Sequence, residues 1–245
     1  MKNAKTQGII LRSRNYSDYD QILTVFTRDF GKIKVMAKGV RRSKSKNRGG
    51  TQVFSLVQME LYRGKNFFRL IQSHSVKSFI EIRESYDKLL AASEWTEVLD
   101  QLISGEEADP SLFSLAVSGL TYLAYQETGK TLVVFEAKLL YQLGYLAPET
   151  SCQICNNQEK LYFTNRGDCF CENCQEPSSK NYLDKAALKT LCFFISQEPE
   201  QIQRLKVSDQ TLSLIALFLH NRISAHLGRE LVIFGYPNHS IDIKS

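Results

Sequence analysis

The order of hydrophobic and polar residues changes character near residue 80. Before that point, short apolar runs are separated by charged and turn-forming residues. The run at residues 32–38 has a period of two, which is typical of a half-buried strand. Similar runs occupy residues 7–12, 22–27, 53–62 and 67–73, with a hairpin turn at 63–66. Five short strands in this length predict a small closed barrel, of the OB type or the SH3 type.

Beyond residue 80, apolar residues recur every three to five positions, which indicates helices. Apolar stripes of this kind run through residues 89–102, 112–123, 132–143, 188–195 and 212–227. Gly144 and Gly228 follow two of the stripes and are typical of helix ends. The stripes predict a helical bundle, which a cluster of cysteines interrupts between the third and fourth helix.

Together these patterns predict an α+β protein, in which an N-terminal five-stranded barrel of the OB or SH3 type precedes an α-helical domain with an inserted four-cysteine zinc module. The predicted parts are 1–79 for the barrel, 80–148 and 179–245 for the helical domain and its tail, and 149–178 for the zinc module. With 43% hydrophobic and 23% charged residues among 245, the composition is globular. It excludes disorder, collagen and coiled coil as descriptions of the whole chain.

The formal net charge of +5 is unevenly distributed, because residues 1–80 carry +13 and residues 81–245 carry −8. A basic N-terminal part suggests a surface that meets a polyanion, and chance clustering of solubilising charge is the alternative. No stretch approaches the roughly 20 apolar residues of a membrane helix, and no apolar core of a secretory signal follows the first lysines. We therefore expect a cytoplasmic protein without membrane contact.

Cationic residues of the barrel are the candidate phosphate contacts. Strand alternation places Lys32 and Lys34 on one face, and Arg12 with Arg14 on another. Residues 38–50 hold cations, no acidic residue and flanking glycines, so we predict a mobile basic loop. The candidate DNA-binding cations are Arg12, Arg14, Lys32, Lys34, Lys38, Arg41, Arg42, Lys44, Lys46 and Arg48. The candidate aromatic residues for base stacking are Tyr16, Tyr62, Phe67 and Phe68. Of the last two, one must face the core.

Five of the six cysteines lie between residues 152 and 174. In a reducing compartment such a cluster is more typical of a metal site than of disulfides. Two Cys-x2-Cys pairs separated by 15 residues have the spacing of a structural zinc site, whose ligands would be Cys152, Cys155, Cys171 and Cys174. Free or redox-active thiols are the alternative. Cys169 is a spare thiol that could replace one ligand, and Cys192 is expected in the core.

Residues 124–131 resemble a phosphate-binding loop with alanine in place of the first glycine. A true loop of this kind follows a strand, whereas this one follows a helical pattern and contains Glu127. We instead predict a helix stop at Gly129 and a helix cap at Thr131. No sequence motif of a zinc hydrolase, a deaminase or a serine hydrolase is present, so we predict that the protein is not an enzyme.

Four separated segments stand out in the chain. They are residues 8–20 (GIILRSRNYSDYD), 23–32 (LTVFTRDFGK), 37–45 (AKGVRRSKS) and 135–145 (FEAKLLYQLGY), the last followed by Pro148, Cys152 and Cys155. In this order they resemble the RecO family of bacterial recombination mediators over nearly the whole length. The resemblance implies an OB-fold, a helical domain and an inserted module with structural Zn²⁺. Asn156 stands where a glycine is common in the family.

The resemblance also implies an activity. RecO-like proteins bind single- and double-stranded DNA and anneal complementary strands. With RecR, and with RecF in one route, they help to place RecA on single-stranded DNA coated by the protein SSB, whose C-terminal tail they bind through the helical region. These partners imply a nucleoid-associated protein.

Three other functions stay open on the residues alone. The first is a zinc-containing OB-fold protein that binds RNA and has no mediator activity. A nucleotide-dependent enzyme using residues 129–131 is the second. A transcription regulator is the third, and it is disfavoured because no helix carries a dense basic face for the major groove.

Overall fold

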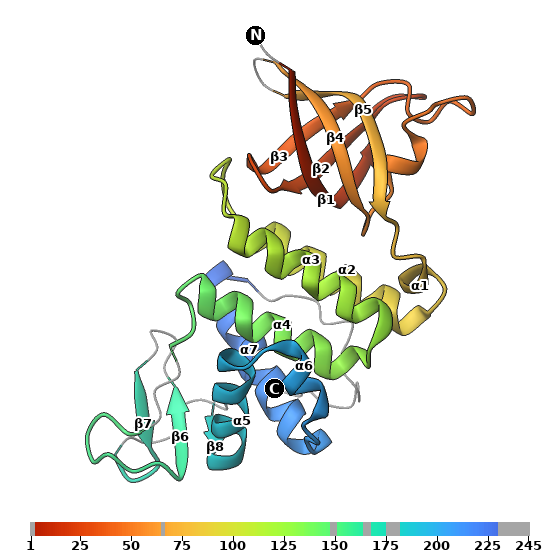
Figure 1. The fold of residues 1–245 in the computed structure, drawn as a ribbon. Coiled ribbons are helices and arrows are strands. Elements are labelled where there is room, and N and C mark those ends of the chain that lie inside the picture. Colours follow the sequence, from red (N-terminus) through yellow and green to blue (C-terminus); the bar gives the residue numbers. More distant parts are fainter. Residues whose placement is uncertain (1–2, 65–66, 148–150, 164–167, 175–181, 230–245) are drawn as a thin grey trace. The chain divides into compact units, whose positions relative to one another are not determined.

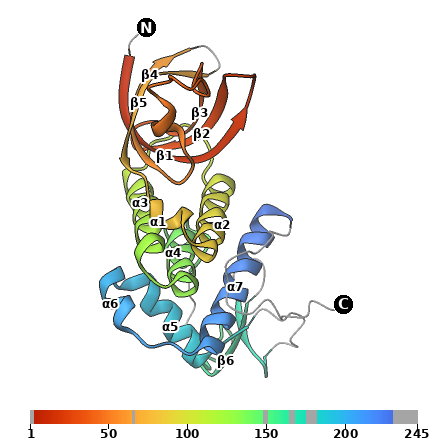
Figure 2. The same cartoon turned by 90° about the vertical axis from the view of Figure 1, so that its right-hand side faces the viewer.

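The computed structural model describes residues 3–64, 67–147, 151–163, 168–174 and 182–229, and Figures 1 and 2 show its elements from two sides. The chain divides into two compact units, Met1–Gln126 and Glu127–Ser245. Among the described residues, the first unit holds a barrel and three helices, and the second holds four helices and a three-stranded sheet.

The N-terminal strands close into a barrel. They are β1 (Asn3–Asn15), β2 (Gln21–Thr27), β3 (Gly31–Ala37), β4 (Leu56–Arg63) and β5 (Phe68–Lys77). Their order around the barrel is β1-β2-β3-β5-β4, and β4 pairs back onto β1. Only the pairing of β3 with β5 is parallel among these five strands. The five-stranded barrel of the OB type is thereby confirmed.

Alternation along β3 decides which side chains fill the barrel. Ile33, Val35 and Ala37 are buried in its core, whereas Lys34 between them is exposed. A shift of the pairing by one residue would bury the lysine and expose the apolar side chains. The sequence pattern therefore fixes both the register of β3 and the outward direction of its charge.

The barrel has a short seam between β3 and β5, where only two residue pairs are in register. Beyond them, the 3-10 helix η1 (Arg48–Thr51) packs against β5. The approach is so close that a Cβ atom on Gly50 would lie 2.4 Å from the Oγ of Ser73. The segment between β3 and β4 thus completes the barrel wall at the seam.

Three helices complete the first unit: α1 (Ile80–Arg83), α2 (Tyr86–Leu102) and α3 (Pro110–Tyr125). The Ser85 hydroxyl accepts a backbone N–H at the start of α2, and the Asp109 carboxylate accepts two at the start of α3. Both are ordinary N-cap residues, which satisfy amides that have no partner inside the helix.

The packing of α2 against α3 depends on a large residue facing a small one. The Trp95 side chain is fully buried, and its Nε1 donates to the Ala116 carbonyl oxygen at 3.2 Å. A Cβ atom on Gly119 would lie 2.6 Å from the indole ring. Glycine at this position therefore provides the space that the indole occupies.

The second unit contains α4 (Thr128–Gln142), β6 (Lys160–Phe163), β7 (Cys169–Cys171), β8 (Tyr182–Asp184), α5 (Lys185–Ser196), α6 (Pro199–Arg204) and α7 (Asp209–Leu227). The sheet has the order β7-β6-β8. Gly228 ends α7 in the left-handed conformation, with φ of 65°, as its position in the sequence predicted. The five predicted stripes coincide with α2, α3, α4, α5 and α7.

The prediction of a helix stop at Gly129 and a cap at Thr131 was wrong. α3 ends at Tyr125, and the carboxylate of Glu127 caps α4 by accepting the N–H groups of Gly129 and Lys130 at 2.8 and 3.0 Å. The Lys130 ammonium group donates to two backbone carbonyl oxygens at the C-terminal end of α6. Residues 124–131 therefore form a helix–helix junction rather than a phosphate-binding loop.

Several predictions fall on parts of the chain that are not described. Residues 65–66 of the predicted hairpin turn, the predicted boundaries at 148 and 178, and the tail from 230 onward lie outside the described residues. The division into parts therefore stays a prediction. Among the described helices, none has the length and apolar character needed to cross a membrane.

Candidate nucleic-acid interface and metal centre

The basic segment, residues 38–50, is fixed at its start to the loop between β1 and β2, which we call the aromatic loop (residues 15–20). The Gly39 N–H donates to Oδ1 of Asp20 at 2.7 Å, and the Arg41 N–H donates to the Tyr19 carbonyl oxygen at 3.1 Å. The Arg41 guanidinium also donates to two carbonyl oxygens of the aromatic loop, at 3.1 and 3.0 Å. Arg41 thus contributes to the fold of this loop as well as to its charge.

The far end of the basic segment is fixed to β5 by Asn47. Its Oδ1 accepts the Ser73 N–H at 2.9 Å, and its Nδ2 donates to the Ile71 carbonyl oxygen at 3.2 Å. One amide side chain thereby pairs with β5 as a neighbouring strand would. These bonds hold the segment at both ends, and the residues between them form successive turns, whereas the mobility of this loop stays a prediction.

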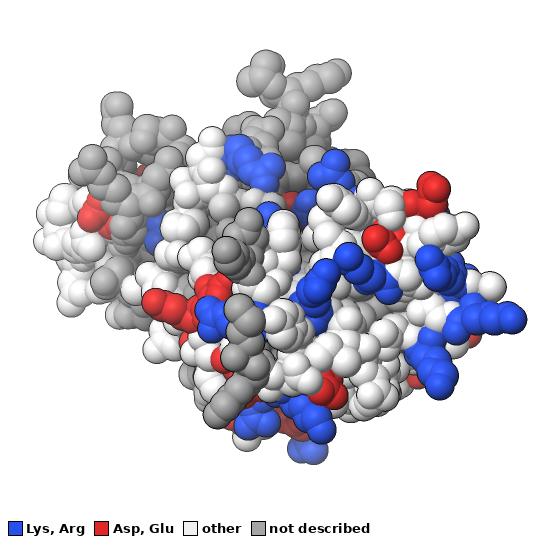
Figure 3. All heavy atoms as spheres, turned by 90° about the horizontal axis from the view of Figure 1, so that it is seen from above, with Lys and Arg blue, Asp and Glu red and all other residues white. Residues whose placement is uncertain are grey.

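The cations of this region are exposed. Figure 3 shows groups of Lys and Arg side chains over the described surface seen from above, with fewer Asp and Glu side chains among them. The exposed candidates are Arg12, Arg14, Lys34, Lys38, Arg41, Arg42, Lys44, Lys46 and Arg48. Many like charges on one segment raise the local potential and favour a polyanionic ligand.

Two of the predicted DNA-binding cations form ion pairs with α2. Nη2 of Arg12 lies 2.5 Å from Oε2 of Glu97 and 3.2 Å from Oδ2 of Asp100. Nζ of Lys32 lies 3.3 Å from Oδ1 of Asp100 and also donates to the Asp100 carbonyl oxygen. These pairs join the barrel to α2 and neutralise part of its charge. These pairs could not be predicted from the sequence, because the partners lie more than 65 positions away.

The aromatic candidates separate by burial. Phe67 is 40% exposed, whereas Phe68 is 4% exposed and belongs to the barrel core. Phe68 therefore has no surface on which a base could stack, and its inclusion among the DNA-binding residues was wrong. Tyr16 is 64% exposed, and Tyr62 is only half-buried.

Tyr19 was not predicted, although the structure places it in the same surface. Its ring is 52% exposed, and the Arg42 guanidinium carbon lies 5.0 Å from the ring centroid. This is the geometry of a cation–π contact between the aromatic loop and the basic segment. The tyrosine spacing in the loop offered a signal, because Tyr16 and Tyr19 both precede β2 in a short polar stretch.

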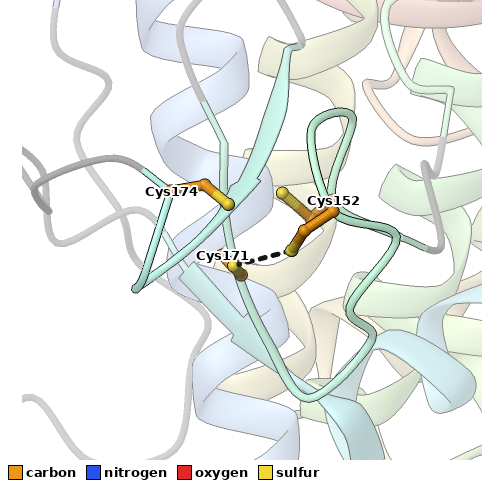
Figure 4. Close-up of side chains that lie close together, drawn as sticks. Cys152, Cys171 and Cys174 are labelled. Carbon is orange, nitrogen blue, oxygen red and sulfur yellow. Dashed lines mark hydrogen bonds between the residues drawn. The ribbon is translucent and has the colours of Figure 1, made fainter.

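Four cysteines of the second unit come together as the sequence spacing predicted. The Sγ atoms of Cys152, Cys155, Cys171 and Cys174 all lie within 4.8 Å of one another, and those of Cys155 and Cys171 are 3.4 Å apart. In Figure 4 the labelled side chains point toward a common centre. Sulfurs that share a tetrahedral zinc ion at about 2.3 Å stand about 3.8 Å from one another, so this cluster fits such an ion.

Turns of the backbone produce this arrangement. The Asn156 N–H donates to the Cys152 carbonyl oxygen at 2.9 Å, and the Cys174 N–H donates to the Cys171 carbonyl oxygen at 3.1 Å. Asn156 has φ of 62°, a left-handed conformation that glycine and asparagine adopt more readily than other residues. Asparagine therefore fits the conformation that this turn requires. Cys169 is fully buried in β7 and is not part of the group of four.

The thiols of Cys152 and Cys174 differ in pKa. Burial acts to raise the pKa of the Cys152 thiol, but backbone N–H groups of Cys155, Cys171 and Ile154 outweigh it and bring the pKa to about 6. Hydrogen bonding to the thiols of Cys155 and Cys171 raises the pKa of Cys174 to about 12. Cys152 thus offers a thiolate at neutral pH, whereas a metal ion must displace the proton of Cys174.

Comparison with known proteins covers almost the entire chain. Residues 1–79 match the family model described as recombination protein O N terminal, and residues 83–232 match the model described as recombination protein O C terminal. A protein of Caldanaerobacter subterraneus named DNA repair protein RecO is 31% identical over 212 residues, which cover 84% of this chain and 86% of that protein. Its namesake from Desulforamulus reducens is 30% identical over 236 residues, covering 94% of this chain and 92% of that protein.

Proposed function

The chain belongs to the RecO family of DNA repair proteins, and from this premise we propose that it acts as a recombination mediator. In this role it binds single- and double-stranded DNA and anneals complementary strands. With RecR, and with RecF in one route, it helps to load RecA onto SSB-coated single-stranded DNA. The role is binding rather than catalysis. One observation carries the proposal. The basic segment is fixed to the barrel near both of its ends, and its cations are exposed.

Annealing requires that two polyanions approach each other. Their repulsion falls when cations of the protein neutralise phosphates, and the counterions released add to the affinity. A segment that is already folded loses little conformational entropy when it binds, so more of the electrostatic gain appears as affinity. The fixed basic segment therefore supports the binding of a strand through its phosphates.

Exposure to solvent favours some of the proposed phosphate contacts over others. The residues we assign to phosphates are Arg14, Lys34, Lys38, Arg42, Lys44, Lys46 and Arg48, which are all exposed. Arg12 and Lys32 contribute less because they pair with acidic residues of α2. Tyr16 and Phe67 are the proposed stacking residues, since both have exposed rings.

We further propose that the four-cysteine group binds Zn²⁺ with a structural role. All four tetrahedral positions are sulfur atoms of the chain, which leaves no position for a water molecule or a substrate. The ion would hold the turns at 152–157 and 171–174 to the paired strands β6 and β7. Metal content measured on protein purified without added metal tests this proposal, and less than half an equivalent of zinc would contradict it.

The remaining partners follow from the family. We propose that the protein contacts RecR and the C-terminal tail of SSB, the latter through its helical part, and that it works in the cytoplasm at the nucleoid. The similar proteins are named DNA repair protein RecO, and this name supports a role of these contacts in DNA repair.

The test of the proposed function is annealing of two complementary oligonucleotides that have first been coated with SSB. The protein should accelerate annealing, alone or with RecR, in proportion to its concentration. Two further measurements distinguish this function from that of an RNA-binding protein. They are the same assay with RNA strands, and direct binding to DNA and RNA of one sequence. No acceleration in the presence of RecR, together with equal or tighter binding of RNA, would favour an RNA-binding protein without mediator activity.

A further inference from the structure

Asp20 is an acidic residue that contacts the basic segment. Its carboxylate accepts the Gly39 N–H at 2.7 Å, and its backbone carbonyl oxygen accepts the N–H groups of Tyr16 and Ser17 at 3.0 and 3.4 Å. The side chain of Asp20 thus holds the basic segment, and its backbone shapes the aromatic loop. No other carboxylate among the described residues joins these two loops by a hydrogen bond that we observe.

The residues next to these bonds form a mixed aromatic and cationic surface. The Tyr19 carbonyl oxygen accepts the Arg41 N–H, so the backbone on both sides of the contact is fixed. This fixed backbone brings the Arg42 guanidinium over the Tyr19 ring at 5.0 Å, while the ring stays 52% exposed. A ring that is braced by a cation and still open to solvent is a surface on which a flat ligand can stack.

We propose that Tyr19 and Arg42 form a subsite for an unpaired base of single-stranded DNA, and that Asp20 is a positioning residue for this subsite. The inference rests on the proposed DNA binding. It identifies the residues that distinguish a single strand from a duplex. Bases of a duplex are stacked on each other and cannot reach Tyr19, whereas phosphates of both forms can meet the lysines. Loss of the subsite should therefore lower single-strand affinity and spare duplex affinity.

Charge alone gives the opposite expectation for Asp20. An acidic group within a cationic surface repels phosphate, so its removal should strengthen DNA binding. If Asp20 positions the subsite, its replacement by alanine must weaken single-strand binding even though the net charge rises by one. The two explanations thus differ in sign.

The experiment measures binding of a dye-labelled oligothymidylate and of a labelled duplex by fluorescence anisotropy at one salt concentration. Y19A should lower single-strand affinity by about 5- to 150-fold, the range for one lost stacking contact, and should change duplex affinity by less than about twofold. D20A should lower single-strand affinity in the same direction. D20N keeps an oxygen acceptor for the Gly39 N–H and should bind as tightly as the unmodified protein or tighter.

Asp18 supplies the matched control. It is exposed, lies two residues from Asp20, and its carboxylate makes no hydrogen bond within the described part of the chain. D18A removes the same charge and should not weaken single-strand binding. Y19A combined with D20A should bind about as weakly as Y19A alone, because Asp20 acts through the tyrosine.

Two results would overturn the inference. The first is that D20A increases single-strand affinity as much as D18A does. The charge of Asp20 would then explain its whole effect. The other is an equal loss of single-strand and duplex affinity in Y19A with an unchanged melting temperature. Absence of any DNA binding by the unmodified protein would instead contradict the proposed function, so the two failures are distinguishable.

Discussion

Replacing Lys38, Lys44 and Lys46 with glutamine should flatten the salt dependence of DNA binding. These three side chains are exposed, and none forms an ion pair within the described residues, so their charges are available to phosphates. Each phosphate contact contributes about 0.9 to the slope of log affinity against log salt on duplex DNA, and about 0.7 on a single strand. The triple variant should therefore lose about 2.7 units of slope on a duplex and about 2.1 on a single strand.

The effect on affinity is large enough to measure directly. Between 50 and 200 mM salt, the difference of about 2.7 units makes the affinity of the unmodified protein for duplex fall about 40-fold more than that of the variant. Fluorescence anisotropy with a labelled duplex at five or six salt concentrations gives both slopes. Melting temperatures of both proteins should agree, because the three lysines lie outside the core.

Two controls decide whether the position of the charges matters. K32Q should change the slope by much less than one unit, because Lys32 is paired with Asp100. Glutamine at the exposed residues Lys189, Arg204 and Lys206 of the second unit removes the same net charge elsewhere. A slope change below about one unit in the first triple variant, or an equal change in the second, would refute the assignment of phosphate contacts to the basic segment.

Further predictions concern the metal centre and the packing of the first unit. C171S should lose the bound zinc and have a lower melting temperature, whereas C169S should keep a full equivalent of zinc. Equal zinc content in the two variants would contradict the assignment of the four ligands. Zinc affinity should fall with falling pH, because protons compete for thiolates such as Cys152, whose pKa is about 6, and a titration between pH 8 and pH 5.5 with a chelating indicator measures this. D100A should lower the free energy of unfolding by about 1–3 kcal/mol, because the pair of Asp100 with Arg12 is half exposed whereas its pair with Lys32 is largely buried; urea unfolding checks this, and an unchanged stability would contradict these pairs. G119A should destabilise by about 1–2 kcal/mol in urea, because a methyl group meets the Trp95 ring at 2.6 Å and outweighs the gain in helix propensity; a more stable variant would contradict that packing.

Patterns with a short period predicted most of the architecture. The alternation around Ile33 and Val35 identified a strand and its inner face, and the stripe ended by Gly228 identified a helix and its last residue. The spacing of the cysteine pairs likewise predicted which four sulfurs meet. In each case the information lies within one short stretch of the chain, which one sequence contains in full.

Features that depend on distant partners could not be predicted. Arg12 looked like a free cation because Glu97, its partner on α2, is 85 positions away. The attachment of the basic segment was not predicted, because its two anchors, Asp20 and Asn47, each bond to a backbone group of another part of the chain. Phe68 was assigned to the surface because strand alternation shows that one of two adjacent residues is buried but not which one.

Beyond the short seam between β3 and β5, the contact of Asn47 with β5 should couple ligand binding to local opening of the barrel wall. The Ser73 amide is held there by the side chain of Asn47, which belongs to the segment that carries the cations. Any ligand that binds the closed segment more tightly than the open one lowers the population of the open form by the same factor. The hydrogen-exchange rate of the Ser73 amide therefore reports occupancy of the surface from inside the barrel wall, and a polyanion should slow it even though the amide never touches the ligand.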